Sequence, residues 1–304
     1  MSRFPFHTAI MVASLALAAG AAHASTFHQQ VAADPRGEVD VSNISGDIII
    51  TGWDRPEVSV TADLPSDSQR VKVITGRGHT RVCVSYGESN GCNSTGWSGD
   101  RGSVRLEIQV PRQSQLDVSA VSADINSRSV SGTQRLQTVS GDINAELGSG
   151  DDEVNSVSGT VTLQGSGQDG TLHAASVSGD LRVMNVAGEL EARTVNGTLT
   201  AELSPARLAR LNTTSGDIAL SAKLASDGTV ETETVSGDQK LSVSAAAGYA
   251  YDAKSFSGDI TNCFGQRSER SEYGPGDRLE GTRGGGAGHV RIQSMSGDVH
   301  LCDK

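Results

Sequence analysis

A short phrase recurs along most of this chain: an apolar residue, Ser-Gly-Asp, and a second apolar residue. Between positions 123 and 258 the central residue of the phrase advances by 18, 18, 20, 18, 19, 21 and 21 residues. A fixed period near 20 residues is the signature of a solenoid, in which each repeat forms one coil and stacks on its neighbours. The repeat therefore predicts a stack of coils and not a domain closed around a single core.

Apolar and polar residues alternate within each repeat, which is the period of a β-strand. Counted from the central residue, position +2 is Ile, Leu or Val in nearly all copies, and position +3 is mostly polar. A coil of 18 to 21 residues holds two short strands around its corner and leaves no room for a helix. We therefore predict an all-β fold, a right-handed parallel β-solenoid or single-stranded β-helix, because parallel crossovers are overwhelmingly right-handed.

The Ser-Gly-Asp corners have a structural explanation. Glycine gives the backbone access to positive φ, and Asp or Ser side chains can accept hydrogen bonds from nearby backbone N–H groups. We interpret the central glycines as turn residues, namely Gly46, Gly141, Gly159, Gly179, Gly197, Gly216, Gly237, Gly258 and Gly297.

Two segments interrupt the period. Between residues 49 and 115 the strand-like pieces 57–60, 71–74, 81–84 and 104–110 predict antiparallel excursions that cover the open edge of the first coils. Residues 265–288 are polar and Gly-rich, and they predict a loop or hairpin on the last coil. We divide the mature chain into an N-terminal strand and cap region at 25–115 and a repeat solenoid at 116–304. A copy at Ser98-Gly99-Asp100 is interpreted as a loop.

Residues 1–24 have the pattern of a signal peptide. Arg3 precedes an apolar stretch at 9–19, and Ala22-His23-Ala24 matches a small-x-small cleavage site. The alternative, a retained membrane anchor, is disfavoured because this stretch is short for about 30 Å of hydrocarbon. We expect an exported protein without membrane insertion, in the periplasm, with the cell surface or secretion as alternatives.

Export determines how the four cysteines are interpreted. Cys83, Cys92, Cys263 and Cys302 form an even set without the C-x-x-C spacing of zinc or redox motifs, so disulfides are expected. Cys263 and Cys302 both lie five residues after a corner glycine, so neighbouring coils would place them side by side on the surface. We predict Cys263–Cys302 and Cys83–Cys92 bonds; four free thiols are the alternative.

The net charge limits the class of partner. With 25 basic and 36 acidic residues, the chain carries a formal charge of −11, which argues against nucleic acid and anionic lipid. A surface glycan or an envelope or matrix protein remains as the partner class, and the oligomeric state stays open.

Three further motifs, together with the repeats, resemble a bacterial family of putative-adhesin domains. They are Gly52-Trp53-Asp54 after the first copy, Val110-Pro111-Arg112 before the main array, and Gly284-Gly285-Gly286 before the last copy. The resemblance covers roughly residues 38–302. It implies one continuous exported β-solenoid domain, similar to autotransporter adhesin heads, with no catalytic residues to transfer.

The Asp after each corner glycine is the sharpest candidate for metal binding. Stacked coils would bring these carboxylates about 4.8 Å apart, a spacing suited to Ca²⁺. Thr160 and Thr198 interrupt the series, so we favour a structural capping role and keep Ca²⁺ as the alternative, with no other cofactor expected. The calcium candidates are Asp142, Asp180, Asp217, Asp238 and Asp259.

Signals for an enzyme are weak. No histidines make an HxH or HExxH spacing, the tyrosines and tryptophans are few and scattered, and Asp151-Asp152-Glu153 is interpreted as a solvated loop. We therefore predict a non-catalytic exported envelope protein, an adhesin or a structural binding module. The alternative is a β-helix that binds or cleaves polysaccharide. A cleft lined by two carboxylates and an aromatic ring would favour that alternative.

Overall fold

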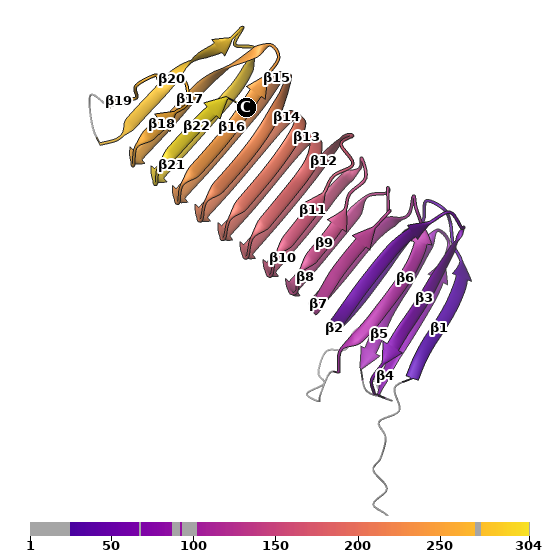
Figure 1. Cartoon of the computed structure of the whole chain (residues 1–304). Helices are drawn as coiled ribbons and strands as arrows, with labels where there is room; N and C mark the ends of the chain where they lie inside the picture. Colours follow the sequence, from indigo (N-terminus) through magenta and orange to yellow (C-terminus); the bar gives the residue numbers. More distant parts are fainter. Residues whose placement is uncertain (1–24, 67, 87–91, 93–101, 271–274, 304) are drawn as a thin grey trace, which may run out of the picture.

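The computed structural model describes residues 25–66, 68–86, 92, 102–270 and 275–303. Within these ranges the regular secondary structure is entirely β-strand, and no helix is long and apolar enough to cross a membrane. Figure 1 shows the strands side by side along one elongated stack. The expected all-β class is confirmed, and so is its solenoid-like repeat.

The middle of the stack consists of parallel strands. It contains β2 (Glu38–Trp53), β7 (Gln115–Arg128), β8 (Gln134–Ser140), β9 (Ile143–Glu146), β10 (Asp151–Ser158), β11 (Val161–Gln164), β12 (Asp169–Ser178), β13 (Leu181–Asn196), β14 (Leu199–Ser215), β15 (Ile218–Ser236) and β16 (Gln239–Ala245). Equivalent residues of successive repeats pair directly, so that Arg135 faces Glu153 and Glu153 faces His173. The sequence period is thus the register of the sheet.

The core lies between the two strand layers of each coil. Position +2 is buried in every coil, and position −5 is buried on the facing strand. In the coil of Gly159, for example, Val161 is 1% exposed and Val154 is fully buried. Each coil contributes only a few apolar side chains, so its core becomes continuous only when neighbouring coils stack on it.

Each corner brings two backbones into close contact. Gly179 has φ +147°, and a Cβ placed on it would lie 2.1 Å from the carbonyl oxygen of Gly159 in the previous coil. The same clash with the preceding corner recurs at Gly159, Gly197, Gly216 and Gly237. Space therefore demands glycine at all of these corners, and a positive φ adds to this demand at each of them except Gly216. Ala123 is tolerated at the first corner of the array, where β7 runs through the corner without a break.

Strands that pair antiparallel with one another cover the N-terminal end of the stack, as predicted. These strands are β1 (Ser25–Ala32), β3 (Glu57–Leu64), β4 (Gln69–Gly76), β5 (His79–Tyr86) and β6 (Val104–Pro111). β5 and β6 pair in parallel with β2, and β3 and β4 pair antiparallel with them. The first repeat in the chain, β2, is thereby sandwiched between this cap and β7.

At the C-terminal end the spatial order of coils departs from chain order. This end contains β17 (Gly248–Ser257), β18 (Ile260–Asn262), β19 (Glu269–Arg270), β20 (Asp277–Gly284), β21 (Gly288–Ser296) and β22 (Val299–Asp303). β21 lies between β15 and β17, and β22 lies between β16 and β18. The last repeat is therefore inserted one coil inside the end. β20 pairs antiparallel with β17 and covers the outermost edge, so the predicted loop contains an edge strand.

A ladder of alternating charges runs across the stack at position −6. Its members, in spatial order, are Asp40, Asp117, Arg135, Glu153, His173, Glu191, Arg210, Glu231, Arg291 and Asp252, with His173 charged only when protonated. Direct contacts include Arg135–Glu153 at 3.0 Å and Arg210–Glu231 at 2.9 Å. The ladder has one like-charge step, from Asp40 to Asp117. Burial first and Asp40 second raise the pKa of Asp117 above its usual value.

The charge ladder is in keeping with the inserted repeat. Its direct ion pairs at this end are Glu231 with Arg210 and Asp252 with Lys254 and Arg278, while Arg291 forms no ion pair with a described residue. If the coils stacked in chain order, Glu231 would lie directly beside Asp252, and like charges opposite one another destabilise a sheet. The insertion places Arg291 between these two carboxylates. Alternating charge thus favours the observed spatial order of the terminal coils. The repeats are otherwise similar enough to pair in a different order.

We predict that Gly179→Val destabilises the protein by at least about 3 kcal/mol, because it adds both backbone strain and a collision with Gly159. Asp180→Asn should change stability by less than about 1 kcal/mol, because an amide oxygen can still accept the hydrogen bond from the N–H of Thr198. Chemical denaturation followed by circular dichroism measures both.

Gly265→Ala is the matched control, since Gly265 also has positive φ, +75°, but no atom lies within 4 Å of its added Cβ. It should cost only the backbone strain. Equal losses at positions 179 and 265 would show that close approach of the coils is not the constraint.

We also predict that Arg291→Glu destabilises the protein by about 1–2 kcal/mol, since two attractive neighbours become repulsive. Arg182→Glu is the control, because Arg182 lies between the neutral Thr162 and Thr200. The difference between the two variants should shrink in 1 M salt. No difference in low-salt denaturation would show that the charge ladder does not stabilise this order.

Candidate functional site

The corner aspartates cap the next coil. An Asp180 carboxylate oxygen accepts a hydrogen bond from the backbone N–H of Thr198 at 2.9 Å, and Asp142 does the same for Thr160 at 2.7 Å. The same bond recurs from Asp124, Asp217, Asp238 and Asp298. This geometry accounts for the recurring Asp without a metal; Ca²⁺ binding by these residues stays a prediction.

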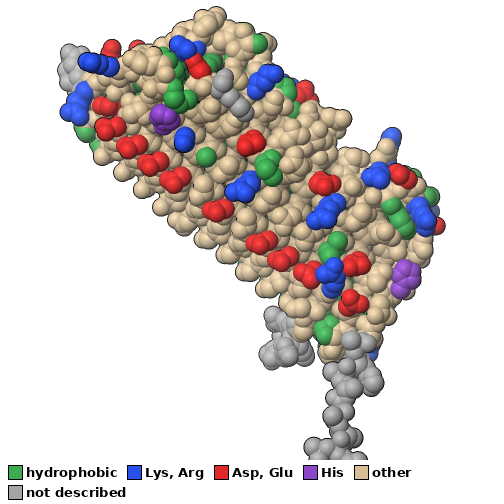
Figure 2. All heavy atoms as spheres, viewed as in Figure 1, with side chains coloured by type: hydrophobic (Ala, Val, Ile, Leu, Met, Phe, Trp, Pro, Cys, Tyr) green, Lys and Arg blue, Asp and Glu red, His purple; other side chains and the backbone are tan. Residues whose placement is uncertain are grey.

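The same carboxylates form an acidic row along one edge of the stack, where Figure 2 shows a line of acidic side chains. The row is exposed, and none of its members forms an ion pair with a described residue: Asp124, Asp142, Asp180, Asp217, Asp238, Asp298 and Asp259. The −6 ladder is largely neutralised by its own neighbours, whereas the acidic row is not.

An apolar row runs beside the acidic row and was not foreseen as a surface. The first residue of the repeat phrase, at position −2, is exposed, from 41% at Val195 to 59% at Met295. Strand alternation instead turns a small hydroxyl residue at −3 inward, as at Ser156 and Thr194. The row consists of Val121, Val139, Val157, Val177, Val195, Val235, Met295 and Phe256. At 4.8 Å per coil it extends roughly 40 Å.

The acidic cluster at 151–153 is not a solvated loop, so that interpretation was wrong. It belongs to β10, where Asp151 is exposed, Glu153 pairs with Arg135, and Asp152 points into the coil with 3% exposure. An Asp152 oxygen accepts the N–H of Gln134 at 2.8 Å. Burial raises the pKa of Asp152 to about 6, against the lowering effect of that hydrogen bond.

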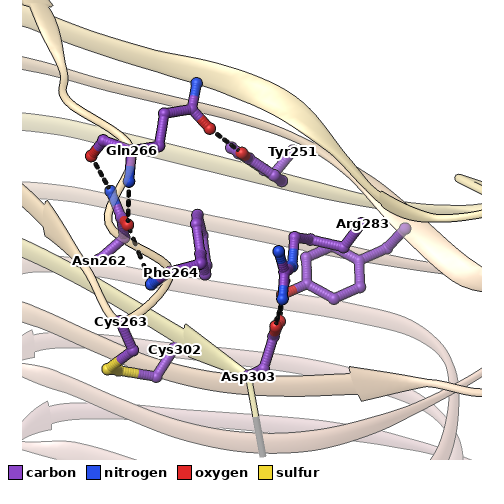
Figure 3. A network of polar contacts seen from close by, with 9 residues as sticks. Tyr251, Asn262, Cys263, Phe264, Gln266, Arg283, Cys302 and Asp303 are labelled. Atoms are coloured by element: carbon purple, nitrogen blue, oxygen red, sulfur yellow. Dashed lines mark hydrogen bonds and ion pairs between the residues drawn. A yellow bond between two sulfur atoms is a disulfide. The ribbon is translucent and has the colours of Figure 1, made fainter.

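Aromatic residues gather at the C-terminal end, although the sequence suggested that they were scattered. The ring of Tyr251 lies 6.2 Å from that of Tyr249 and 5.4 Å from that of Phe264. The guanidinium of Arg283 lies 4.8 Å from the Phe264 ring centre and pairs with Asp303 (Figure 3). Sequence separation hid this cluster, because the inserted coil assembles it from β17, β20 and β22.

Buried hydroxyls and a loop turn complete this cluster. Tyr249 donates to Asp303, and Tyr251 donates to Gln266. Burial first, and Asp303 second, raise the pKa of Tyr249 above its ordinary value. Asn262 fixes the turn by accepting the N–H groups of Phe264 and Gln266, each at 3.1 Å. These contacts hold the cap in place.

A cleft of about 590 Å³ lies at the same end, on the side of the apolar row. It is lined by exposed Phe256, by Glu269 and Asp277, and by the cations Lys254, Arg270 and Arg278. Asp277 is held by the Ser268 hydroxyl at 3.0 Å and by Arg270 at 3.9 Å. Two carboxylates and one aromatic ring therefore do meet in a cleft of ligand size.

The structure contains the two disulfides expected from the sequence, Cys83–Cys92 and Cys263–Cys302. The Cα atoms of Cys263 and Cys302 are 4.9 Å apart, as expected for adjacent strands. Cys263 is exposed, so this bond lies at the surface. It joins the outermost coil, which contains β18, to the inserted last repeat, which contains β22. Residues 87–91 of the loop closed by Cys83–Cys92, the predicted signal peptide at 1–24 and Ser98-Gly99-Asp100 lie outside the described residues.

Comparisons with known proteins give a family and a set of similar folds. A family model described as Toastrack DUF4097 matches residues 36–302. No curated protein sequence matches the chain. Similar solved structures include a putative adhesin from Bacteroides fragilis (12% identity, TM-score 0.40, covering 92% of this chain and 97% of that one). A putative adhesin from Parabacteroides distasonis is 11% identical (TM-score 0.36, covering 92% and 98%). A putative cell adhesion protein from Clostridium sporogenes is also 11% identical (TM-score 0.23, covering 92% and 100%).

The buried carboxyl predicts a pH-dependent stability. The pKa of Asp152 is higher in the folded chain, about 6, than in the unfolded chain, about 3.9, so its protonated form favours folding. This contribution is fully present below about pH 4 and is lost as pH rises through 6. Relative to Asp152→Asn, the wild type should lose on the order of 2–3 kcal/mol between pH 4 and pH 7. Denaturant titrations across this range measure it; parallel curves for the two proteins would contradict the assignment.

Proposed function

This chain belongs to the Toastrack DUF4097 family, and we propose that it is a non-catalytic exported envelope protein that binds a surface partner along the edge of its stack. The family is defined by its fold and not by an activity. The function must therefore be argued from the surface. We further propose that the stack is a right-handed β-solenoid, the hand that parallel crossovers favour.

The apolar row supports this proposal most directly. At position −2 the larger apolar residue faces solvent while a Ser or Thr occupies the interior at −3, the reverse of what core packing favours. The inversion recurs at one register position from Val139 to Phe256, except in the coil of Gly216, where the exposed Thr214 interrupts the apolar row. Exposed apolar surface that recurs over many coils is typical of an interaction site. A regular ridge of this kind suits an extended or repetitive partner better than a compact small molecule.

Export is supported by the two disulfides, which persist in oxidising compartments. We propose the periplasm as the location, with the cell surface or the exterior as alternatives. A surface glycan or a matrix protein is the proposed partner class. We propose no bound cofactor; the acidic row would at most recruit Ca²⁺ when the partner is also present.

The cleft favours a second candidate function, polysaccharide binding. Phe256 offers an exposed ring on which a sugar could stack, and Glu269, Arg270 and Lys254 offer polar groups for its hydroxyls. Asp277 is engaged by Ser268 and Arg270. Binding without cleavage is the form of this alternative that we propose.

The test is a glycan and matrix-protein array probed with the purified mature chain, with and without Ca²⁺. We expect a bound polymer that is released unchanged, and weaker binding by Val157→Ser/Val177→Ser/Val195→Ser. The matched control is Gln164→Ser/Glu202→Ser, two exposed changes on the other strand layer. Lys254→Ala/Glu269→Ala separates the candidates, because both residues line the cleft and neither belongs to the apolar row. It should abolish glycan binding only if the cleft is the site. Turnover of any bound polymer, or full binding by the triple variant, would contradict the main proposal.

A further inference from the structure

A three-residue group of metal-ligand type surrounds the surface disulfide. His300 and Cys302 lie on one face of β22, and Cys263 follows β18 on the adjacent strand. His300 Nε2 is 3.1 Å from Cys302 Sγ and 3.6 Å from Cys263 Sγ. All three potential ligand atoms lie within 4.8 Å of one another. The repeat register therefore produces a Cys₂His set that no C-x-x-C or HxH spacing revealed.

A neighbouring hydroxyl orients the imidazole. Thr261 Oγ1 lies 2.8 Å from His300 Nδ1 and 3.4 Å from the backbone carbonyl oxygen of Val299. Because the Thr261 hydroxyl can donate its one proton to that carbonyl, it can accept the proton on Nδ1. Nε2 is then the nitrogen with the free lone pair, and it faces the two sulfur atoms. Metal-binding histidines are oriented in this way by a partner on the other ring nitrogen.

We propose that the reduced form of this group binds a thiophilic metal ion of the Zn²⁺ class through Cys263, Cys302 and His300 Nε2. Bonds of about 2.3 Å to sulfur and 2.0 Å to nitrogen place N and S about 3.5 Å apart and the two S atoms about 3.8 Å apart in a tetrahedral site, so the sulfur atoms must separate once the disulfide is reduced. The observed N–S distances of 3.1 and 3.6 Å are close to that separation. A fourth position faces solvent, because Cys263 is exposed.

The disulfide and the metal exclude one another. An external dithiol supplies two electrons and two protons, which open the S–S bond to two thiols while the dithiol is oxidised to its own disulfide. The metal ion then displaces both thiol protons to solvent and forms two metal–sulfur bonds and one metal–nitrogen bond. In the oxidised protein the sulfur atoms are bonded to each other and cannot act as thiolate ligands. The site is thus gated by redox state.

The experiment uses the purified mature chain after reduction with a phosphine and removal of the reductant. The Cys263–Cys302 bond should yield two free thiols per chain. Because Cys83 is buried but its partner Cys92 is partly exposed, the titration is also run on Cys83→Ser/Cys92→Ser, in which only these two thiols can form. Titration with Co²⁺ should give one equivalent of a species with thiolate-to-cobalt absorption, which Zn²⁺ then displaces. Oxidised wild type should show no such absorption.

Variants separate a three-ligand site from simple thiol binding. His300→Ala should lose the stoichiometric complex, and Thr261→Val should weaken Zn²⁺ binding by about tenfold to a hundredfold. His289→Ala is the control, an exposed histidine on the other strand layer of the same coil. Unchanged circular dichroism shows that each variant is folded. Absence of the cobalt–thiolate band in reduced wild type, or equal affinity in His300→Ala, would overturn the proposal.

Discussion

Close contact between the backbones of successive coils is the constraint on which the rest of this structure depends. At the corner, each coil lies so near the previous one that a single added Cβ would reach a carbonyl oxygen, at 2.1 Å for Gly179 and 2.3 Å for Gly197. This contact makes glycine necessary, and it brings each Asp within reach of the next N–H group. Once the corners are stacked in register, each remaining position of the repeat lies beside the same position of the next coil. The buried positions form the apolar core, position −6 forms the charge ladder, and position −2 forms the exposed apolar row.

Stacking also leaves open strand edges, which segments near the two ends of the chain cover. A parallel stack exposes an unpaired strand at each end, which invites aggregation. Both ends are covered by antiparallel strands, β1, β3 and β4 at one end and β20 at the other. At both ends one repeat also departs from chain order. β2 lies between β7 and the N-terminal cap strands β5 and β6, and β21 lies between β15 and β17. A chain of similar repeats needs a signal to choose that order, and the observed order places Arg291 between Glu231 and Asp252.

The insertion concentrates the chemically varied residues at the C-terminal end. Strands that are 39 residues apart in sequence become neighbours there, which joins Cys263 to Cys302. The same topology assembles Tyr251 and Phe264 against Arg283 (Figure 3) and builds the cleft around Phe256. The long, uniform edge is suited to a repetitive partner. The end of the stack is where a discrete ligand or a metal ion would be recognised.

The sequence by itself determined the repeat strands, the coil length, the corner glycines and the Cys263–Cys302 pair, because all of these follow from residues that recur in one local register; Cys83–Cys92 is the pair that then remains. It could not determine the order of the terminal coils, because the energies that decide this order act between strands distant in the chain. Burial was also beyond its reach: Asp152 looked like part of a solvated loop but is buried, and no sequence pattern marked Val177 as exposed. Period-two alternation is the same for either face of a strand. Only the stacked structure decides which face is covered.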